Sequence, residues 1–220
     1  MELTKKGEFI EIKYTGYANG NIFDSNINED LKDAGSKKEG WKTIIAIGEG
    51  MVVPGLDKAL EGKEIGKNYD VKISVKEGFG ERRKDMMRII PLNAFTEKEV
   101  MPRPGMMLTL DNMLVKVITV SGARVTVDFN NPLAGKELVY KFSIARKVEE
   151  DKERAEALFE IMFKFIPEFE IKEKVIIKGP KILEAYSKAF SEKFKQLMGK
   201  ELGFELKESK KIEEKSNSAQ

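Results

Sequence analysis

The sequence predicts an α+β protein built from three units, with strands dominating the first two and helices the last. Three patterns support this: alternating apolar residues in the first 80 positions, short strand-like runs in a methionine-rich middle, and helical apolar spacing in the last seventy. The expected units are residues 1–83 with 134–149, residues 84–133, and residues 150–207. A charged tail, 208–220, is expected to be disordered.

Strands are expected to make up most of the first unit. Residues 9–14 and 69–75 alternate between apolar and polar side chains, which gives each strand one buried face. Residues 43–47 form a short β-branched run, and residues 26–40 are polar and predict a loop. A short helix is expected between the Pro-Gly pair at 54–55 and the glycine at 62.

The middle and last units differ in their patterning. Runs at 106–110, 114–120 and 124–129 are separated by turn residues and predict a small antiparallel module, after which alternation resumes at 138–147. In the last unit, apolar residues at i, i+3, i+4 and i+7 predict a helix over 153–166, which Pro167 ends. A weak strand over 169–178, a long helix after Gly179-Pro180 and a closing strand at 204–207 complete it.

Composition excludes several classes of chemistry. The chain has no histidine and no cysteine, which rules out disulfides, thiolate nucleophiles, histidine bases and histidine-ligated zinc. Its 39 Lys+Arg against 37 Asp+Glu leave a net charge of +2 without a basic patch, so nucleic acid is not an expected partner. No run of about 18 apolar residues occurs, so no membrane span is expected. A cytoplasmic location is expected from the missing cysteines and export signal, and neither a cofactor nor a metal is expected.

Turn glycines recur beside aromatic and β-branched residues, with one carboxylate among them. In order, these are Tyr14-Thr15-Gly16, Phe23-Asp24-Ser25, the run IGEGMVVPGLDKALEGKEIGK ending at Lys67, and Gly78-Phe79-Gly80. With LAGKELVYKFSIARKV after residue 132, this order resembles the FKBP-type peptidyl-prolyl cis-trans isomerases. The resemblance covers roughly residues 1–83 and 134–149.

The resemblance implies an antiparallel sheet wrapped on a short helix. It extends to the SlyD-like branch, in which an insert-in-flap domain interrupts the isomerase fold where residues 84–133 lie here. The additional C-terminal α/β unit resembles that of the long archaeal members. Two departures are visible: Leu56 stands where many members have Trp, as in the SlyD-like branch, and the histidine-rich metal-binding tail of some relatives is absent.

The family assigns roles to residues of the expected pocket. It implies that an apolar, water-excluding pocket favours the twisted X-Pro amide, with Asp24 at its wall and the backbone N–H of Val52 facing the substrate carbonyl. Without the family order, each aromatic residue is interpreted as ordinary core packing and Asp24 as a turn-capping residue. The residues implied as catalytic are Tyr14, Phe23, Asp24, Phe79 and Tyr140, and those implied to bind substrate are Ile45, Met51, Val52, Val53 and Leu56.

The methionines of the middle unit allow two interpretations, an irregular core or an adaptable binding surface. The family favours a surface that captures unfolded chain near the pocket. The residues expected on it are Met86, Met87, Ile89, Phe95, Met101, Met106 and Met113.

The apolar stripe of helix 153–166 exceeds what a small unit hides. We expect a homodimer through the C-terminal unit, with docking onto the chain's own first unit as the alternative. The expected function is isomerisation of X-Pro bonds in unfolded polypeptides, with capture by the inserted unit. The alternatives are a non-catalytic holdase with the same fold and a structural adaptor without clients.

Overall fold

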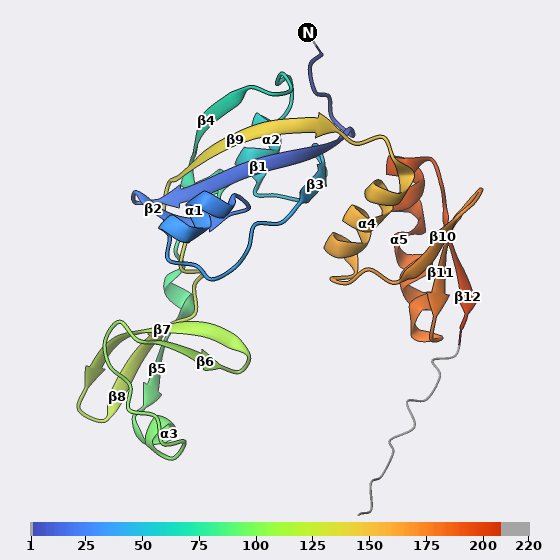
Figure 1. The fold of residues 1–220 in the computed structure, drawn as a ribbon. Helices are drawn as coiled ribbons and strands as arrows, with labels where there is room; N and C mark the ends of the chain where they lie inside the picture. The colour runs from blue at the N-terminus through green and yellow to red at the C-terminus, as the bar shows by residue number, and fades with distance from the viewer. Residues whose placement is uncertain (1, 208–220) are drawn as a thin grey trace, which may run out of the picture.

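The computed structural model describes residues 2–207, so the predicted disordered tail lies outside the described residues. The chain forms three sheets, each with its own apolar core. Figure 1 shows the first sheet with the insert (residues 84–133) and the C-terminal unit (residues 150–207) extending from it as two separate arms. An α+β fold is thereby confirmed.

The first sheet has the strand order β2-β1-β9-β4, and β3 pairs with the first four residues of β1. All of its pairings are antiparallel. Two short helices cover it, α1 and α2. The bounds are β1 Phe9–Ala18, β2 Asn21–Ser25, α1 Asn28–Asp33, β3 Thr43–Ala46, α2 Pro54–Ala59, β4 Asn68–Ile73 and β9 Leu138–Lys147.

The core of this unit lies between the sheet and α2. Ile10 and Ile12 point inward from β1 because alternate side chains of a strand share a face, and both are at most 1% exposed. Leu56 and Leu60, one turn apart at α2, fill the same core. Pro54 begins α2, as expected for a residue whose missing N–H would be unpaired there anyway.

The insert is a four-stranded antiparallel sheet of order β5-β8-β7-β6. Asp111 and Asn112 both have positive φ, of 49° and 61°, which is the geometry of the tight hairpin turn predicted there. The core is mainly valine from alternate positions of β7 and β8, closed by Phe95 and Phe129. The bounds are β5 Met87–Pro91, α3 Asn93–Thr96, β6 Met107–Leu110, β7 Met113–Ser121 and β8 Arg124–Asp128, preceded by the 3-10 turns η1 Val75–Glu77 and η2 Lys84–Met86.

Polar side chains fasten the two connections between the insert and the first sheet. The Asn130 carboxamide accepts a hydrogen bond from the Arg83 N–H (2.8 Å) and donates to the Arg83 carbonyl (2.9 Å). It also donates to Asp128 (2.6 Å), which accepts from Arg82 as well. Burial raises the pKa of the Asp128 carboxyl, but these hydrogen bonds outweigh burial and leave the pKa below its usual value. We call Arg82, Arg83, Asp128 and Asn130 the insert latch.

Two helices pack on a three-stranded sheet in the C-terminal unit, where β10 is antiparallel and β12 parallel to β11. The parallel pair is possible because α5 crosses back between β11 and β12. Gly199, with φ of 73°, ends α5. The bounds are α4 Asp151–Met162, β10 Glu168–Ile171, β11 Val175–Gly179, α5 Ile182–Met198 and β12 Leu202–Leu206.

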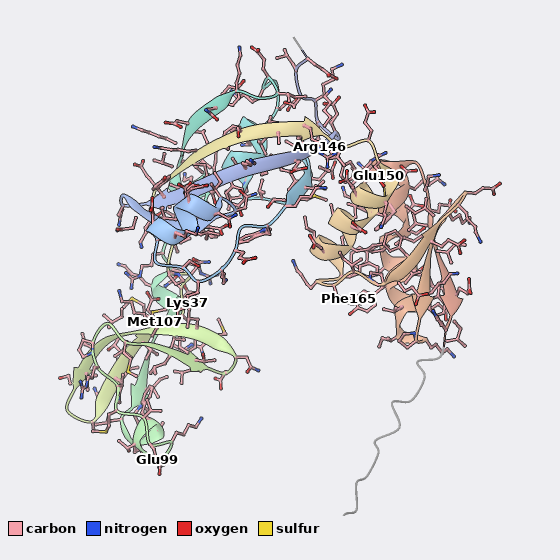
Figure 2. All side chains as sticks on the ribbon, viewed as in Figure 1. Lys37, Glu99, Met107, Arg146, Glu150 and Phe165 are labelled. Carbon is pink, nitrogen blue, oxygen red and sulfur yellow. The ribbon has the colours of Figure 1, made fainter. Side chains whose placement is uncertain are left out.

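The C-terminal unit docks on the first unit of its own chain. Phe9, Ala46 and Val148 of the first unit belong to the same buried core as Leu158 and Phe159 of α4. Figure 2 shows Arg146 and Glu150 at the two ends of the short connection that joins the units. The apolar stripe of α4, which suggested more apolar surface than a small unit buries, therefore packs against the first unit of the same chain.

Charged groups line the edge of this docking contact. Glu153 on α4 pairs with Lys42 and, at 2.8 Å, with Arg146, which also contacts Glu11 at 2.9 Å. The guanidinium of Arg154 lies 4.8 Å from the centre of the Phe9 ring. The contact between the two units thus combines a buried apolar centre with ion pairs at its edge.

Several predicted elements need correction. The polar stretch 26–40 contains α1, whose single buried side chain, Leu31, gives too little periodicity to be noticed. The helix predicted to 166 ends at Met162, because Lys164 adopts positive φ before the proline is reached. The closing strand begins at Leu202, two residues earlier than predicted. Within residues 2–207, no helix is long and apolar enough to cross a membrane.

Candidate functional site

A cavity of about 560 Å³ opens in the first unit between the sheet and the segment that leads into α2. Its walls are aromatic and aliphatic, with one carboxylate. The lining residues are Tyr14, Phe23, Asp24, Met51, Val52, Val53, Leu56, Phe79 and Tyr140.

Sheet register brings the polar and aromatic wall together. Asp24 of β2 and Tyr140 of β9 both lie opposite Gly16 of β1, on its two sides. A Cβ at position 16 would come within 2.6 Å of the Phe23 ring and 3.0 Å of Tyr140. The glycine of the Tyr-Thr-Gly motif is therefore required for the aromatic side chains to close over the strand.

The aromatic rings hold one another in edge-on contacts. Phe23 meets Phe79 with centroids 6.1 Å apart at 83°, and Tyr140 at 5.7 Å and 89°. Tyr14 and Tyr140 are tilted at 6.1 Å. These are favourable arrangements for ring quadrupoles, so the pocket wall is preformed rather than collapsed.

Among the residues that the structure describes, Asp24 is the only carboxylate on the cavity wall, and it accepts a 2.9 Å hydrogen bond from the Tyr14 hydroxyl. Burial, reinforced by the Asp24 charge, raises the pKa of Tyr14 far above its usual value. The same two causes raise the pKa of Tyr140. Both phenols are therefore neutral donors at physiological pH. Tyr140 also lines the cavity.

Nine of the ten residues expected at the pocket line this cavity. The exception is Ile45, which is 1% exposed and lies in the core beneath the cavity. Ile45 was expected at the pocket from the family resemblance, but its side chain does not reach the cavity wall. The roles of the other nine in catalysis stay predictions.

The residues expected on the capture surface of the insert differ in how far they are exposed. Ile89 (64% exposed), Met101 (69%), Met106 (39%) and Met113 (43%) are on the surface. Phe95 is only 3% exposed and fills the insert core, so it is corrected to a core residue, and Met86 packs partly against the same core. Met87 is half-buried.

Two exposed apolar residues of the insert were missed from the sequence. Met107 is 41% exposed and Leu114 54%. Figure 2 places Met107 at the end of the insert nearest the first sheet, with Glu99 at the opposite end. β6 alternates, with Met107 and Thr109 exposed and Leu108 and Leu110 half-buried against the insert core, but the sequence did not show which face is exposed.

Comparison with known proteins agrees with this geometry. Residues 2–99 match the family described as FKBP-type peptidyl-prolyl cis-trans isomerase. The short-type peptidyl-prolyl cis-trans isomerase of Methanocaldococcus jannaschii is 31% identical over 147 residues, which cover 66% of this chain and 92% of that protein. The chain belongs to the FKBP-type peptidyl-prolyl cis-trans isomerases.

Within the FKBP family, further relatives carry the SlyD name. SlyD of Haemophilus influenzae is 35% identical over 104 residues, which cover 44% of this chain and about half (53%) of that protein. SlyD of Helicobacter pylori is 27% identical over 158 residues, or 69% and 78% of the two chains. Residues 88–133 match the family described as FKBP26, IF domain.

Membership decides between two of the functions expected from the sequence. This FKBP is a peptidyl-prolyl cis-trans isomerase, and the non-catalytic holdase has no observation in its favour. X-Pro rotation needs no nucleophile and no base, which a chain without histidine or cysteine satisfies. No group of three or more metal-binding side chains is found in the part of the chain that the structure describes.

Proposed function

We propose that this FKBP isomerises X-Pro bonds of unfolded or partly folded polypeptides in the cytoplasm, with the proline ring seated in the cavity between Phe23, Phe79 and Leu56. The support is a preformed apolar cavity of about 560 Å³ with hydrogen-bonding groups on one wall. A cysteine-free chain also suits a reducing compartment.

Catalysis in this proposal follows from how the amide changes as it twists. Rotation about the X-Pro bond faces a barrier of ~18–20 kcal/mol because it breaks amide resonance. The twisted amide is less dipolar than the planar one, so a dry apolar wall disfavours the planar form more. Asp24, held by Tyr14, and the Tyr140 hydroxyl are proposed to interact with the twisted amide, and the backbone N–H of Val52 to hold its carbonyl.

A peptide assay tests this proposal directly. We expect wild type to accelerate X-Pro isomerisation in a short peptide, and Asp24→Ala or Phe23→Ala to lower kcat/KM by about tenfold or more, as loss of a preorganised wall would. Ile45→Val, beneath the cavity, is the matched control and should keep most of the activity. Equal activity of all variants would remove these roles from Asp24 and Phe23.

We further propose that the insert captures clients and raises the concentration of their prolines at the pocket. The large apolar side chains that the insert exposes support this, since exposed apolar surface is typical of sites that bind other proteins. They are Ile89, Met101, Met106, Met107, Met113 and Leu114.

A variant that loses activity on a protein substrate but not on a short peptide would identify this capture. Met101→Ser combined with Leu114→Ser should slow the refolding of a proline-limited protein about tenfold while leaving the peptide rate unchanged, since avidity is lost and not chemistry. The control is Glu99→Ser, a polar residue of the same insert. Equal losses on both substrates would contradict a capture role.

The proposed homodimer rests on apolar surface that remains after the C-terminal unit has docked. Phe165 is 45% exposed, Ile182 69% and Tyr186 37%. Figure 2 shows Phe165 just after α4, at the edge of this unit. Sedimentation should give a dimer for wild type and a monomer for Phe165→Glu with Ile182→Glu. A monomeric wild type would remove the proposal.

A further inference from the structure

One wall of the proline pocket is held from outside by the C-terminal unit. Residues 48–53 supply three lining residues, Met51, Val52 and Val53. Glu49 in the same segment forms an ion pair with Lys193 of α5, although the two residues are 144 positions apart. The Glu49 side chain is only 7% exposed, as is that of Asp128 in the insert latch, so solvent screens this pair less than it screens ion pairs between exposed groups.

The same segment is anchored on its inner side by α2. The Asp57 carboxylate accepts hydrogen bonds from the Gly48 N–H (2.7 Å) and the Gly50 N–H (2.8 Å), the two neighbours of Glu49. Asp57 is itself 7% exposed. Residues 48–50 are therefore clamped between a carboxylate of the first unit and an ammonium group of the C-terminal unit.

Met51 connects the clamp to the cavity. Its side chain lines the pocket and packs against both the core of the first unit and the core that includes α4 and α5. The Ala46 N–H lies 3.1 Å from its sulfur. A displacement of α5 consequently reaches the pocket wall through Glu49 and, two residues further on, through Met51.

We propose that the C-terminal unit shapes the isomerase site, with Lys193 as a positioning residue for the segment 48–53. This inference rests on the proposed use of the cavity as the proline site. Without the ammonium group, the Glu49 carboxylate would be nearly buried and unpaired, and would move toward water. The segment would follow, and the wall formed by Met51 and Val52 would lose its preformed position.

The test uses full-length variants and a short X-Pro peptide, which does not depend on client capture. Lys193→Ala should lower kcat/KM about five- to tenfold, since small misplacements of positioning groups are costly in rate. Lys193→Arg, which keeps the charge, should restore it to within about twofold of wild type. The matched control is Lys188→Ala on the same helix, whose ammonium group pairs only with Glu184 at 2.7 Å in the described residues.

A charge exchange separates positioning from simple loss of folding. The double variant Glu49→Lys with Lys193→Glu should recover activity that each single change loses, as expected for two groups coupled to each other. The amide resonances of Gly48 and Gly50 should shift in Lys193→Ala and return in the exchange. A merely structural role would lower the melting temperature without a matching change in these resonances or in kcat/KM.

The outcomes distinguish this inference from the proposed function. If wild type does not accelerate the peptide reaction, the proposed function fails. If wild type is active and Lys193→Ala equals Lys188→Ala in kcat/KM, the positioning role is overturned while the proposed function stands. If Lys193→Arg loses as much activity as Lys193→Ala, the ion pair is not the coupling.

Discussion

Gly16 is the smallest residue of the pocket region and has a large structural effect. It carries no side chain, yet the Phe23 ring occupies the place where a Cβ would stand, and Tyr140 approaches from the other side. Packing of this kind leaves no room for adjustment, because both neighbours are rings fixed by edge-on contacts. The pocket geometry therefore requires that position 16 carry no side chain.

Gly16→Ala should consequently disturb both stability and activity. Overpacking against two rings is expected to lower the free energy of unfolding by about 1–3 kcal/mol and to displace Phe23 from the cavity wall. Denaturant unfolding and the peptide assay measure the two effects. Gly203→Ala on β12 is the control, since a Cβ there meets only Ile176 at an ordinary 3.6 Å. Equal activity of the two variants would contradict this account.

The two pocket tyrosines lead to a prediction on pH. Burial and the Asp24 charge raise the pKa values of Tyr14 and Tyr140, so both phenols stay protonated well above their usual pKa of about 10. Peptide isomerisation should therefore show no loss of rate through pH 10. Spectrophotometric titration should find two tyrosines that ionise later than the exposed ones. A fall in kcat near pH 10 would show that a pocket phenol ionises normally.

The insert latch acts at the scale of elements. Asn130 satisfies both the N–H and the carbonyl of Arg83, and Asp128 joins it to Arg82 on the opposite connection. The two connections are thus tied across the point where the insert leaves the first sheet. We expect these hydrogen bonds to restrict the direction in which the insert extends from the first sheet.

Asn130→Ala should let the orientation of the insert relative to the first sheet vary more, without altering the pocket. The expected result is an unchanged peptide rate together with slower refolding of a proline-limited protein, because the capture surface no longer stays near the site. NMR relaxation should show the insert tumbling more independently. Asn131→Ala is the matched control, since its side chain bonds only locally to the Leu133 N–H. Identical results for the two variants would count against a latch.

Secondary structure was predicted best where one face of a strand or helix is buried and the other is exposed to solvent. Strands at 69–75 and 138–147 were found at nearly those positions, because alternation follows directly from the pleat. The edge strand β2 and the helices α1 and α3 were not predicted, since each buries at most one side chain. The single strand predicted over 169–178 was wrong, because residues 172–174 turn the chain and it forms two antiparallel strands, β10 and β11. The closing strand was located to within two residues, but its parallel pairing with β11 has no local signature.

The pocket was predicted through family motifs rather than by periodicity. The motifs gave nine lining residues, whereas Ile45 and Phe95 were misplaced because depth of burial depends on the tertiary neighbours of a strand or turn. Nothing local marked Glu49 or Lys193. Their pairing across 144 positions exists only after two units have docked.

At the scale of the whole molecule, Glu153 adds ion pairs to the apolar contact through which the C-terminal unit docks. Hydrogen bonding to Arg146 first, and then to Lys42, lowers the pKa of Glu153 from 4.5 to about 2. A carboxylate whose pKa is depressed on folding contributes stability above its unfolded pKa and loses it as pH falls. The contribution of Glu153 should therefore be complete above about pH 4.5 and be lost as the pH falls through about 2.

Comparison of wild type with Glu153→Gln tests this window. Wild type should be the more stable at pH 7, and the difference should shrink between pH 4.5 and 2 as Glu153 takes up its proton. Chemical denaturation at a series of pH values measures it, and other acidic groups cancel because both proteins carry them. Glu156→Gln, on the same helix with a longer contact of 3.9 Å to Lys152, is the control. A difference that persists at pH 2 would assign the stability to something other than charge.

The place of β9 in the first sheet has a consequence for the order of synthesis. β9 lies between β1 and β4 and carries Tyr140, yet the ribosome makes it only after the whole insert. The insert, whose strands are all close in sequence, has every partner it needs once residue 129 has emerged. During translation the part proposed to hold clients is therefore complete while the sheet that forms the proline pocket still has a gap at its centre. A newly made chain acquires its insert before its pocket.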